Sequence, residues 1–359
     1  MQMNKNSFVA SQEEVMKLKK IVALSTSVIM CISLMVGCSS KSKTDEGSIK
    51  TDLSIGLVLG EGSINDQSFN QATWEGLQKA REDFGIEVKY LESQQESEYI
   101  QNIETLVDED TDLIIGVGYQ LKDAIQKSAE HYPEKYFAIL DETYENIPEN
   151  VVPVVFNEQE AAYLTGIIAA KMTKTNNVGF IGGLPAPGVV KYQYGYKYGV
   201  ETTNKDIKVY EQYANTFTDQ AKGKAIAKQM YASNVDVILS AAGDSGTGAI
   251  EASKENNKYA IGVDRDQSNL APDNVITSAL KKLNIASYDL AKMLVEGNFK
   301  GGTEKVYGLK EGAVGMPENT NKLVPQDIVD YVNQEAEKVI NGEIKVPKNE
   351  EEYKALIKE

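Results

Sequence analysis

The sequence contains one histidine, one tryptophan and two cysteines in 359 residues. A Ser-His-Asp or Cys-His catalytic site would have to use His131, which lies in a polar helix end and is simply explained there as a solvated residue. No cysteine or histidine spacing typical of a metal site is present. We therefore expect no enzyme, no metal and no cofactor.

Basic residues are also scarce, because 37 Lys and Arg face 53 Asp and Glu, which gives a formal net charge of −16. A chain this acidic repels phosphate backbones, and it has no stripe of Lys and Arg with interleaved aromatic residues. Nucleic-acid binding is therefore not expected. The apolar content of 42% is typical of a globular protein, and 359 residues favour two domains.

The N-terminus has the features of an export signal. Lysines within 17–20 precede an apolar run over 21–36, which is short and early for a membrane-spanning helix and predicts a signal peptide over 1–37. The run ends in Met35-Val36-Gly37-Cys38, which resembles the bacterial lipobox, although that motif prefers Leu where Met35 stands. The resemblance implies that Cys38 is diacylated; an uncleaved anchor helix is the alternative.

Both alternatives export the rest of the chain. We expect translation to start at Met16, and Cys31 to leave with the signal peptide, so that the mature protein has no disulfide. Residues 39–51 contain one apolar residue, and 38–51 is therefore predicted to be a lipidated cysteine followed by a flexible tether. The expected location is the extracytoplasmic face of a bacterial cell membrane, reached through this lipid anchor.

From residue 53 onward, short apolar runs alternate with helical periodicity in two successive halves. The first half predicts strands at 53–59, 86–91, 112–117, 136–140 and 151–156, with helices near 69–83, 97–108, 119–130 and 158–172. The second half predicts strands at 177–182, 207–211, 235–240, 259–263 and 275–279, with helices near 189–202, 218–232, 246–256 and 283–296. Crossovers of this length join parallel strands whose sheets are covered by helices on both faces.

The two halves also match in detail. Tyr136-Phe-Ala-Ile-Leu-Asp141 parallels Tyr259-Ala-Ile-Gly-Val-Asp264, so each half places an Asp at the end of its fourth strand. We predict an α/β protein of two Rossmann-like lobes with a hinged ligand cleft between them. For either Asp alone, a local role in capping the next turn stays open.

The predicted organisation follows from this duplication. The expected segments are an N-terminal lobe over 52–156, a crossover helix over 157–174, a C-terminal lobe over 175–279, a return crossing toward the N-terminal lobe over 280–324, and a helical element over 325–359 that has a turn at Asn341-Gly342 and packs across a lobe.

Asp66-Gln67-Ser68-Phe69-Asn70-Gln71 follows the first strand, where ligands bind in open α/β sheets. Ser68 and Gln71 fit a capping box, which would explain both without a ligand. Asp66 and Asn70 suit either local turns or ligand contacts. Phe69 either staples the helix or stacks on a planar ligand.

The second half supplies three further candidates. Tyrosines recur at 192, 194, 196 and 198; most are expected to pack, while one near the helix start faces Phe69. The run Gly243-Asp-Ser-Gly-Thr-Gly248 either brings backbone amides to a ligand or is a turn with Ser245 or Thr247 as N-cap. Lys281 is expected to pair with Asp264, and such a pair can hold vicinal hydroxyls.

These residues together resemble the basic membrane protein (BMP) family, the purine nucleoside receptor lipoproteins of ABC-type importers. The resemblance runs from about residue 53 to the C-terminus. It is carried by Asn65–Gln71, Tyr163–Gly166, Val178–Gly183, Ala242–Gly248, Ile261–Gln267 and Ser278–Lys281. It implies a type I periplasmic-binding-protein fold, an ABC permease as partner, and a monomer. A lipoprotein sensor of the same fold, without transport, is the alternative function.

The resemblance also implies a role for each candidate residue. In the family pattern, Phe69 stacks on the purine with Asp66 and Asn70 near it, Asp141 accepts from the base edge, Gly246 lies along the ribose, and Asp264 and Lys281 hold the ribose hydroxyls. Tyr192 stands where the family usually has its second stacking Phe. A tyrosine stacks as well as Phe, but its hydroxyl needs a partner.

Overall fold

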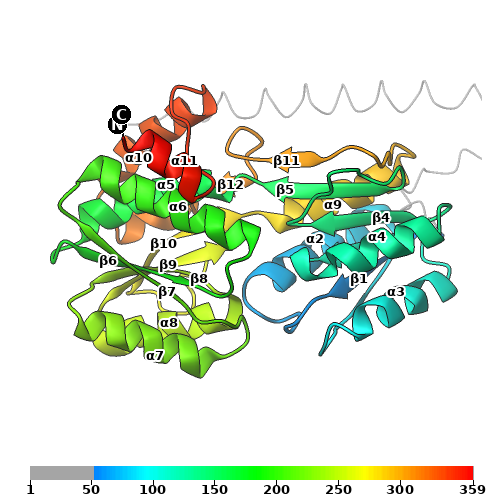
Figure 1. Cartoon of the computed structure of the whole chain (residues 1–359), viewed down its shortest axis with the longest axis horizontal. Coiled ribbons are helices and arrows are strands. Elements are labelled where there is room, and N and C mark those ends of the chain that lie inside the picture. The colour runs from blue at the N-terminus through cyan, green and yellow to red at the C-terminus, as the bar shows by residue number, and fades with distance from the viewer. Residues whose placement is uncertain (1–51, 359) are drawn as a thin grey trace, which may run out of the picture. The chain divides into compact units, whose positions relative to one another are not determined.

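The computed structural model of the chain describes residues 52–358. The predicted signal peptide, Cys38 and the tether lie outside the described residues. Within 52–358 the chain forms two α/β lobes, each built on a six-stranded sheet. Figure 1 shows the blue and cyan elements of the N-terminal lobe beside the green and yellow elements of the C-terminal lobe. The predicted fold class is confirmed.

The N-terminal lobe is built mainly from the first half of the described chain. Its elements are β1 (Ser54–Leu59), α2 (Phe69–Phe84), β2 (Glu87–Leu91), α3 (Glu98–Asp108), β3 (Leu113–Val117), the 3-10 helix η1 (Tyr119–Leu121), α4 (Lys122–His131), β4 (Tyr136–Leu140), β5 (Val151–Phe156) and β11 (Lys305–Tyr307). The strand order is β11-β5-β4-β3-β1-β2, and all pairs are parallel. Central strand β3 is wholly buried, as expected for a parallel strand covered on both faces.

The C-terminal lobe repeats this order. Its elements are α5 (Glu158–Met172), β6 (Asn177–Gly182), α6 (Pro187–Thr203), β7 (Lys208–Tyr213), α7 (Gln220–Ala232), β8 (Val237–Ala241), α8 (Gly243–Asn256), β9 (Tyr259–Asp264), β10 (Val275–Lys281) and β12 (Val314–Gly315). The strand order is β12-β10-β9-β8-β6-β7, with β12 alone antiparallel to its neighbour. The matching orders confirm the duplication inferred from sequence.

The chain after β10 visits the N-terminal lobe and returns. Helix α9 (Leu283–Val295) packs against α2, and β11 joins β5 at the sheet edge, as Figure 1 shows. The chain then re-enters the C-terminal lobe through β12 and the 3-10 helix η2 (Glu318–Lys322). Strands β11 and β12 were not predicted, because runs of three and two residues carry no periodicity.

The C-terminal helices pack on the C-terminal lobe. Helix α10 (Gln326–Ile340) lies against α5, where the Tyr163 hydroxyl bonds Glu335 at 3.0 Å, and α11 (Glu350–Leu356) lies against α6. Between them Gly342 has a φ of 75°, in agreement with the predicted turn. Figure 1 shows α10 and α11 beside α5 and α6.

Glycines allow the two crossing helices to approach their neighbours closely. A Cβ at Gly199 of α6 would lie 2.1 Å from the Tyr163 carbonyl of α5, and a Cβ at Gly195 would lie 2.3 Å from the Gln159 carbonyl. Likewise, a Cβ at Gly76 of α2 would lie 2.2 Å from the Asn284 carbonyl of α9. Helix α5 is therefore joined to the C-terminal lobe, and α9 to the N-terminal lobe.

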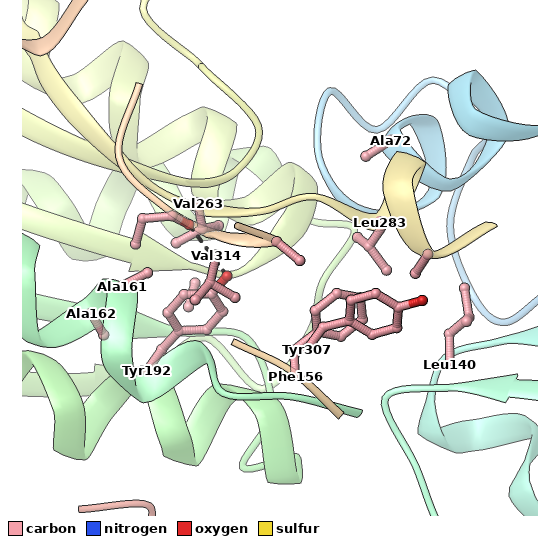
Figure 2. Packing of buried hydrophobic residues seen from close by; sticks show 14 of the residues in the cluster. Ala72, Leu140, Phe156, Ala161, Ala162, Tyr192, Val263, Leu283, Tyr307 and Val314 are labelled. Carbon is pink, nitrogen blue, oxygen red and sulfur yellow. Dashed lines mark hydrogen bonds between the residues drawn. The ribbon is translucent and has the colours of Figure 1, made fainter. Parts of the chain in front are cut away.

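A continuous apolar core runs from one lobe to the other at the crossings. Figure 2 shows Phe156, at the end of β5, stacked on Tyr307 of β11, with 5.6 Å between the ring centroids. The same core includes Tyr192 of α6 and Leu283, the first residue of α9. The carboxyl ends of both sheets meet beside this core, which places the loops after the strands around a common space.

Candidate ligand-binding site

A cavity of about 120 Å³ lies between the carboxyl ends of the two sheets. One water molecule needs about 10–15 Å³ by such a measure, so several fit. Seven of the predicted contact residues line this cavity: Asp66, Phe69, Asn70, Asp141, Tyr192, Asp264 and Lys281. The lining also includes Glu61 and Phe217 in loops and Tyr119 and Gln120 in the 3-10 helix η1, which sequence reasoning missed because none of them stands in a distinctive pattern.

Asp66 caps the start of α2. Its buried carboxylate accepts the backbone N–H groups of Ser68 at 2.9 Å, Asn70 at 2.9 Å and Gln71 at 3.1 Å. Ser68 makes no capping bond, and the side-chain amide of Gln71 donates to Glu75 instead. The capping-box prediction was therefore wrong, because the two oxygens of Asp66 already satisfy these amides. Asn70, beside it, donates its side-chain amide to the Ser63 carbonyl at 3.2 Å.

Asp141 and Asp264 occupy equivalent positions, just after β4 and at the end of β9. Their backbone φ angles are 64° and 65°, in the left-handed region that residues other than glycine rarely adopt. Strain of this kind is retained where the surrounding structure requires it, commonly at binding sites. Both carboxylates line the cavity, one from each lobe.

Asp264 is held by donors from both lobes. Its carboxylate accepts the Ser68 hydroxyl from the N-terminal lobe and the Tyr192 hydroxyl, at 3.2 Å, from α6. The hydroxyl of Tyr192 thus has the partner that it requires. Further contacts at the rim join Arg265 to Glu75 at 2.9 Å and Gln267 to the Gln67 carbonyl at 3.0 Å. These contacts close the cleft.

Lys281 reaches a different partner from the one predicted. Its buried ammonium is hydrogen-bonded to Asp141, and it lies 3.3 Å from Glu158 Oε1. The predicted pairing with Asp264 was wrong, because Lys281 ends β10 at the crossing where Asp141 and the first residue of α5 converge. The ammonium also lies 4.7 Å from the ring centroid of Phe69 and 5.8 Å from that of Tyr192.

The remaining tyrosines of α6 pack, as expected. Tyr196 is fully buried, Tyr194 packs against Tyr353 of α11 with 5.6 Å between ring centroids, and Tyr198 packs against Tyr163 with 5.7 Å. Tyr192 is therefore the tyrosine of this series that reaches the cavity.

Helix α8 begins three residues earlier than predicted. Gly243 is its first residue, with a φ of 54°, and the cap residue Ala242 makes no side-chain bond, so the N-cap roles considered for Ser245 and Thr247 were wrong. Ala242 and Gly243 line the cavity, whereas Gly246 lies within the helix and does not. The early start occurs because Gly243 adopts a backbone conformation that other residues resist.

Glu158 is a charged residue that sequence reasoning missed. Its side chain is 1% exposed, and Lys191 of α6 forms an ion pair with its second oxygen at 3.1 Å. The Lys191 ammonium also donates to the Phe156 carbonyl at 2.7 Å. No signal marked Glu158, since acidic residues are ordinary in the first turn of a helix. Its burial depends on the crossing, which local sequence does not specify.

Burial and neighbouring charges set the protonation of this cluster. Burial raises the pKa of Asp141 to about 6, against the opposing effect of the Lys281 ammonium. Burial also raises the pKa of Asp66 to about 6, against three backbone N–H bonds. Burial acts likewise on Glu158, but Lys281 and Lys191 outweigh it and hold its pKa below the ordinary value. Burial disfavours the Lys281 ammonium, but Asp141 and Glu158 outweigh this and raise its pKa.

A family model described as ABC transporter substrate-binding protein PnrA-like matches residues 54–350. The chain belongs to the PnrA-like family. Membership makes it a substrate-binding protein of the ABC transporter type, with a small-molecule ligand, a permease partner and an extracytoplasmic site of action.

Two relatives extend over nearly the whole chain. Basic membrane protein A of Borreliella burgdorferi is 40% identical over 331 residues, covering 91% of this chain and 96% of that protein. The ABC transporter nucleoside-binding protein BmpA of Lactococcus lactis is 34% identical over 353 residues, covering 92% of this chain and 99% of that protein. The resemblance stated from the motifs is confirmed.

The fold also matches a solved structure of the same class. An ABC transporter solute-binding protein from Aeropyrum pernix K1 superposes with a TM-score of 0.78 and 28% identity, covering 85% of this chain and 96% of that chain. The predicted periplasmic-binding-protein fold is thereby confirmed.

Over residues 52–358, the PnrA-like chain has no helix with both the length and the apolar character needed to cross a bilayer, and no acidic, histidine or cysteine cluster suited to a metal ion.

Proposed function

We propose that the protein captures nucleosides, purine nucleosides foremost, in the cavity between its lobes and delivers them to an ABC permease. The observation that carries this proposal is the make-up of the cavity wall. Four aromatic residues and four carboxylates surround a single ammonium among the described lining residues. The set comprises Phe69, Tyr119, Tyr192 and Phe217; Glu61, Asp66, Asp141 and Asp264; and Lys281.

A nucleoside suits this wall chemically. Its planar base stacks on aromatic rings, and its hydroxyl and amino groups donate to carboxylates. A nucleotide suits the wall poorly, because its phosphate would meet four carboxylates with one ammonium that Asp141 and Glu158 already neutralise. The relative from Lactococcus lactis, named as nucleoside-binding, supports the same substrate class.

The site residues then take distinct roles. Phe69 and Tyr192 enclose the base, with Asp66 and Asn70 holding the start of α2, which carries Phe69. Asp141 accepts from the base edge, a role supported by its Oδ1 atom, which is buried and has no hydrogen-bond partner in the protein.

The strand ends of the C-terminal lobe take the sugar in this proposal. Asp264 and Lys281 hold the ribose hydroxyls, since a carboxylate accepts and an ammonium donates. Gly243 replaces Gly246 as the glycine beside the ribose, because Gly243 lies at the wall where α8 begins.

We further propose that Cys38 carries the lipid anchor and that residues 38–51 are a tether. The lipobox-like run before Cys38 supports this placement. An acylated cysteine with two or more chains suffices for stable attachment to the bacterial cell membrane. We propose also that the receptor acts as a monomer.

Isothermal titration tests the ligand class on residues 48–359, which form one compact unit. The protein is first unfolded and refolded to remove ligand carried from expression. We expect micromolar or tighter binding of adenosine, guanosine or inosine, weaker binding of uridine, and at least about hundredfold weaker binding of the 5′-monophosphates. No binding of any of these four nucleosides would sink the proposal.

A matched pair of substitutions tests the stacking role. Phe69→Ala should weaken nucleoside binding about tenfold or more, because stacking of a base on an aromatic ring contributes about 1–3 kcal/mol. Phe84→Ala serves as the control, because Phe84 lies at the other end of the same helix and packs on Tyr288, with 5.2 Å between ring centroids. If Phe69→Ala instead unfolds the lobe, Phe69 is a helix staple.

A further inference from the structure

We propose that Glu158 is a positioning residue for Lys281, which it holds at the cavity wall whether the cleft is open or closed. The inference rests on the proposed function, in which Lys281 contacts the ligand. Glu158 does not itself line the cavity. It would act on ligand binding only through the lysine beside it.

The contacts of the ammonium support this assignment. Lys281 is 3% exposed; its Nζ atom bonds Asp141 and lies 3.3 Å from Glu158 Oε1. An ammonium has three donors, so one donor remains for an acceptor in the cavity. The second oxygen of Glu158, Oε2, is buried without a hydrogen bond but forms an ion pair at 3.1 Å with the Lys191 ammonium, which donates to the Phe156 carbonyl.

The two carboxylates around Lys281 belong to different lobes. Glu158 begins α5, whose close contact with Gly195 and Gly199 of α6 joins it to the C-terminal lobe that contains Lys281. Asp141 follows β4 of the N-terminal lobe. Opening of the cleft would therefore separate Lys281 from Asp141, while the contact with Glu158 is made within one lobe.

This arrangement keeps a counter-charge beside the buried ammonium of Lys281 in both states of the cleft. A buried ammonium that loses its counter-charge is strongly destabilised. If Asp141 leaves Lys281, either as the cleft opens or as it accepts from a ligand, Glu158 still provides the opposite charge. Lys281 therefore keeps its place and its proton, and Asp141 is free to serve as an acceptor.

The start of α6 is shaped to the same cluster. A Cβ at Gly188 would lie 3.0 Å from Glu158 Oε1 and 3.2 Å from Asp141 Oδ2, so a side chain there would press on both carboxylates. Glycine brings the positive end of the helix dipole close to Glu158 and Asp141, which favours their ionised forms.

The test compares Glu158→Gln with Glu158→Asp in residues 48–359, using adenosine and 2′,3′-dideoxyadenosine as probes. We expect Glu158→Gln to weaken adenosine binding at least tenfold and to abolish the preference for adenosine over the dideoxy analogue. Glu158→Asp, which keeps the carboxylate, should recover adenosine binding to within about threefold of the natural protein. A merely structural role would not shift the preference between the two probes.

The control is Glu335→Gln. Glu335 is also a buried carboxylate, bonded to Tyr163 on α5 and to Lys338, but it is remote from the cavity lining. It should leave both affinities unchanged. Natural affinity and preference in Glu158→Gln would overturn the inference, as would loss of folding in both Glu158 variants.

A second readout separates this inference from the proposed function. If the natural protein binds no nucleoside, the proposed function fails, but crystal structures of the unliganded natural protein and Glu158→Gln still test the positioning role. We expect the Lys281 ammonium to lie against Glu158 in the former and to leave that position in the latter. An unmoved ammonium would refute the role of Glu158.

Discussion

At the residue scale, Asp141 and Glu158 share one ammonium but differ in their other surroundings. Glu158 lies between two lysines, which hold its pKa below the ordinary value despite burial. Burial raises the pKa of Asp141 to about 6. Its Oδ1 atom has no hydrogen-bond partner, whereas Oε2 of Glu158, which also lacks a hydrogen bond, faces the Lys191 ammonium at 3.1 Å. Glu158 is therefore suited to be a permanent charge, and Asp141 to be an acceptor whose charge depends on pH.

This difference predicts that nucleoside affinity falls as the pH falls through about 6. Protonation of Asp141 removes the acceptor. Because pH 5 lies one unit below the pKa of about 6, only about one molecule in ten keeps the carboxylate there, so the Kd at pH 5 should be about tenfold higher than at pH 7.5. Titration calorimetry at both values measures the change, and Asp141→Asn should bind weakly with a flatter profile. An affinity that is constant from pH 7.5 to 5 would contradict the role of Asp141.

The Asp141 carboxyl also makes the free energy of unfolding depend on pH, but in the opposite direction from nucleoside affinity. Its folded pKa of about 6 exceeds the ordinary value of 3.8, so the folded protein binds this proton more tightly than the unfolded chain. The contribution of Asp141 to stability is therefore full below about pH 4 and is lost as the pH rises through about 6. Comparison of urea unfolding in the unliganded natural protein and Asp141→Asn isolates this contribution.

At the element scale, the start of α2 combines two roles in neighbouring residues. Asp66 bonds three backbone amides, and Ser68 reaches across the cleft to Asp264. Asp66→Ala should therefore lower the free energy of unfolding by about 1–2 kcal/mol, as loss of an N-cap does. Ser68→Ala should cost about 1.5–3 kcal/mol, since it removes a buried hydrogen bond to the Asp264 carboxylate, and this cost should disappear in an Asp264→Asn background. Urea unfolding measures each change, and a cost of Ser68→Ala that persists in that background would revive the capping box.

Elements with strong local patterns could be predicted from the sequence, and those formed by the crossings could not. Every predicted strand is present, with ends shifted by no more than two residues. The central strands are buried, continuous apolar runs, whereas the more exposed edge strands β2 and β7 mix apolar and polar residues. Strand β11 contains the exposed Val306 and forms only because the chain returns beside β5. The start of α8 at Gly243 depended on a glycine backbone angle, which residue type permits but does not specify.

In the site, too, residues at the ends of strands could be predicted from the sequence, whereas contacts formed where the chain crosses between the lobes could not. The position of Asp141 and Asp264 followed from matched strands, since the ends of parallel strands meet at one edge. The partner of Lys281 could not be predicted, because Asp141 and Glu158 come from sequence positions 140 and 123 residues away. Glu158 was overlooked for this reason, as its neighbours are set by how the two lobes are joined.

At the scale of the whole molecule, the two lobes meet through polar contacts at the rim of the cleft. Arg265 of the C-terminal lobe pairs with Glu75 on α2, and Gln267 donates to the Gln67 carbonyl. These contacts hold the closed arrangement, whereas the cavity behind them holds the ligand in the proposed function. Rim contacts should therefore govern the rate at which a bound nucleoside escapes more than its rate of entry.

This argument predicts that Arg265→Ala increases the dissociation rate of a bound nucleoside about two- to fivefold and leaves the association rate nearly unchanged. The factor is modest because the pair is partly exposed, with 27% of the Arg265 side chain and 41% of the Glu75 side chain accessible, and such pairs contribute about 0.2–1 kcal/mol. Stopped-flow displacement measures the rate. Lys224→Ala is the control, because its ion pairs with Glu251 and Glu255 lie within one lobe and should not affect release. Equal acceleration by both substitutions would mean that surface charge in general, not closure at Arg265, sets the rate of escape.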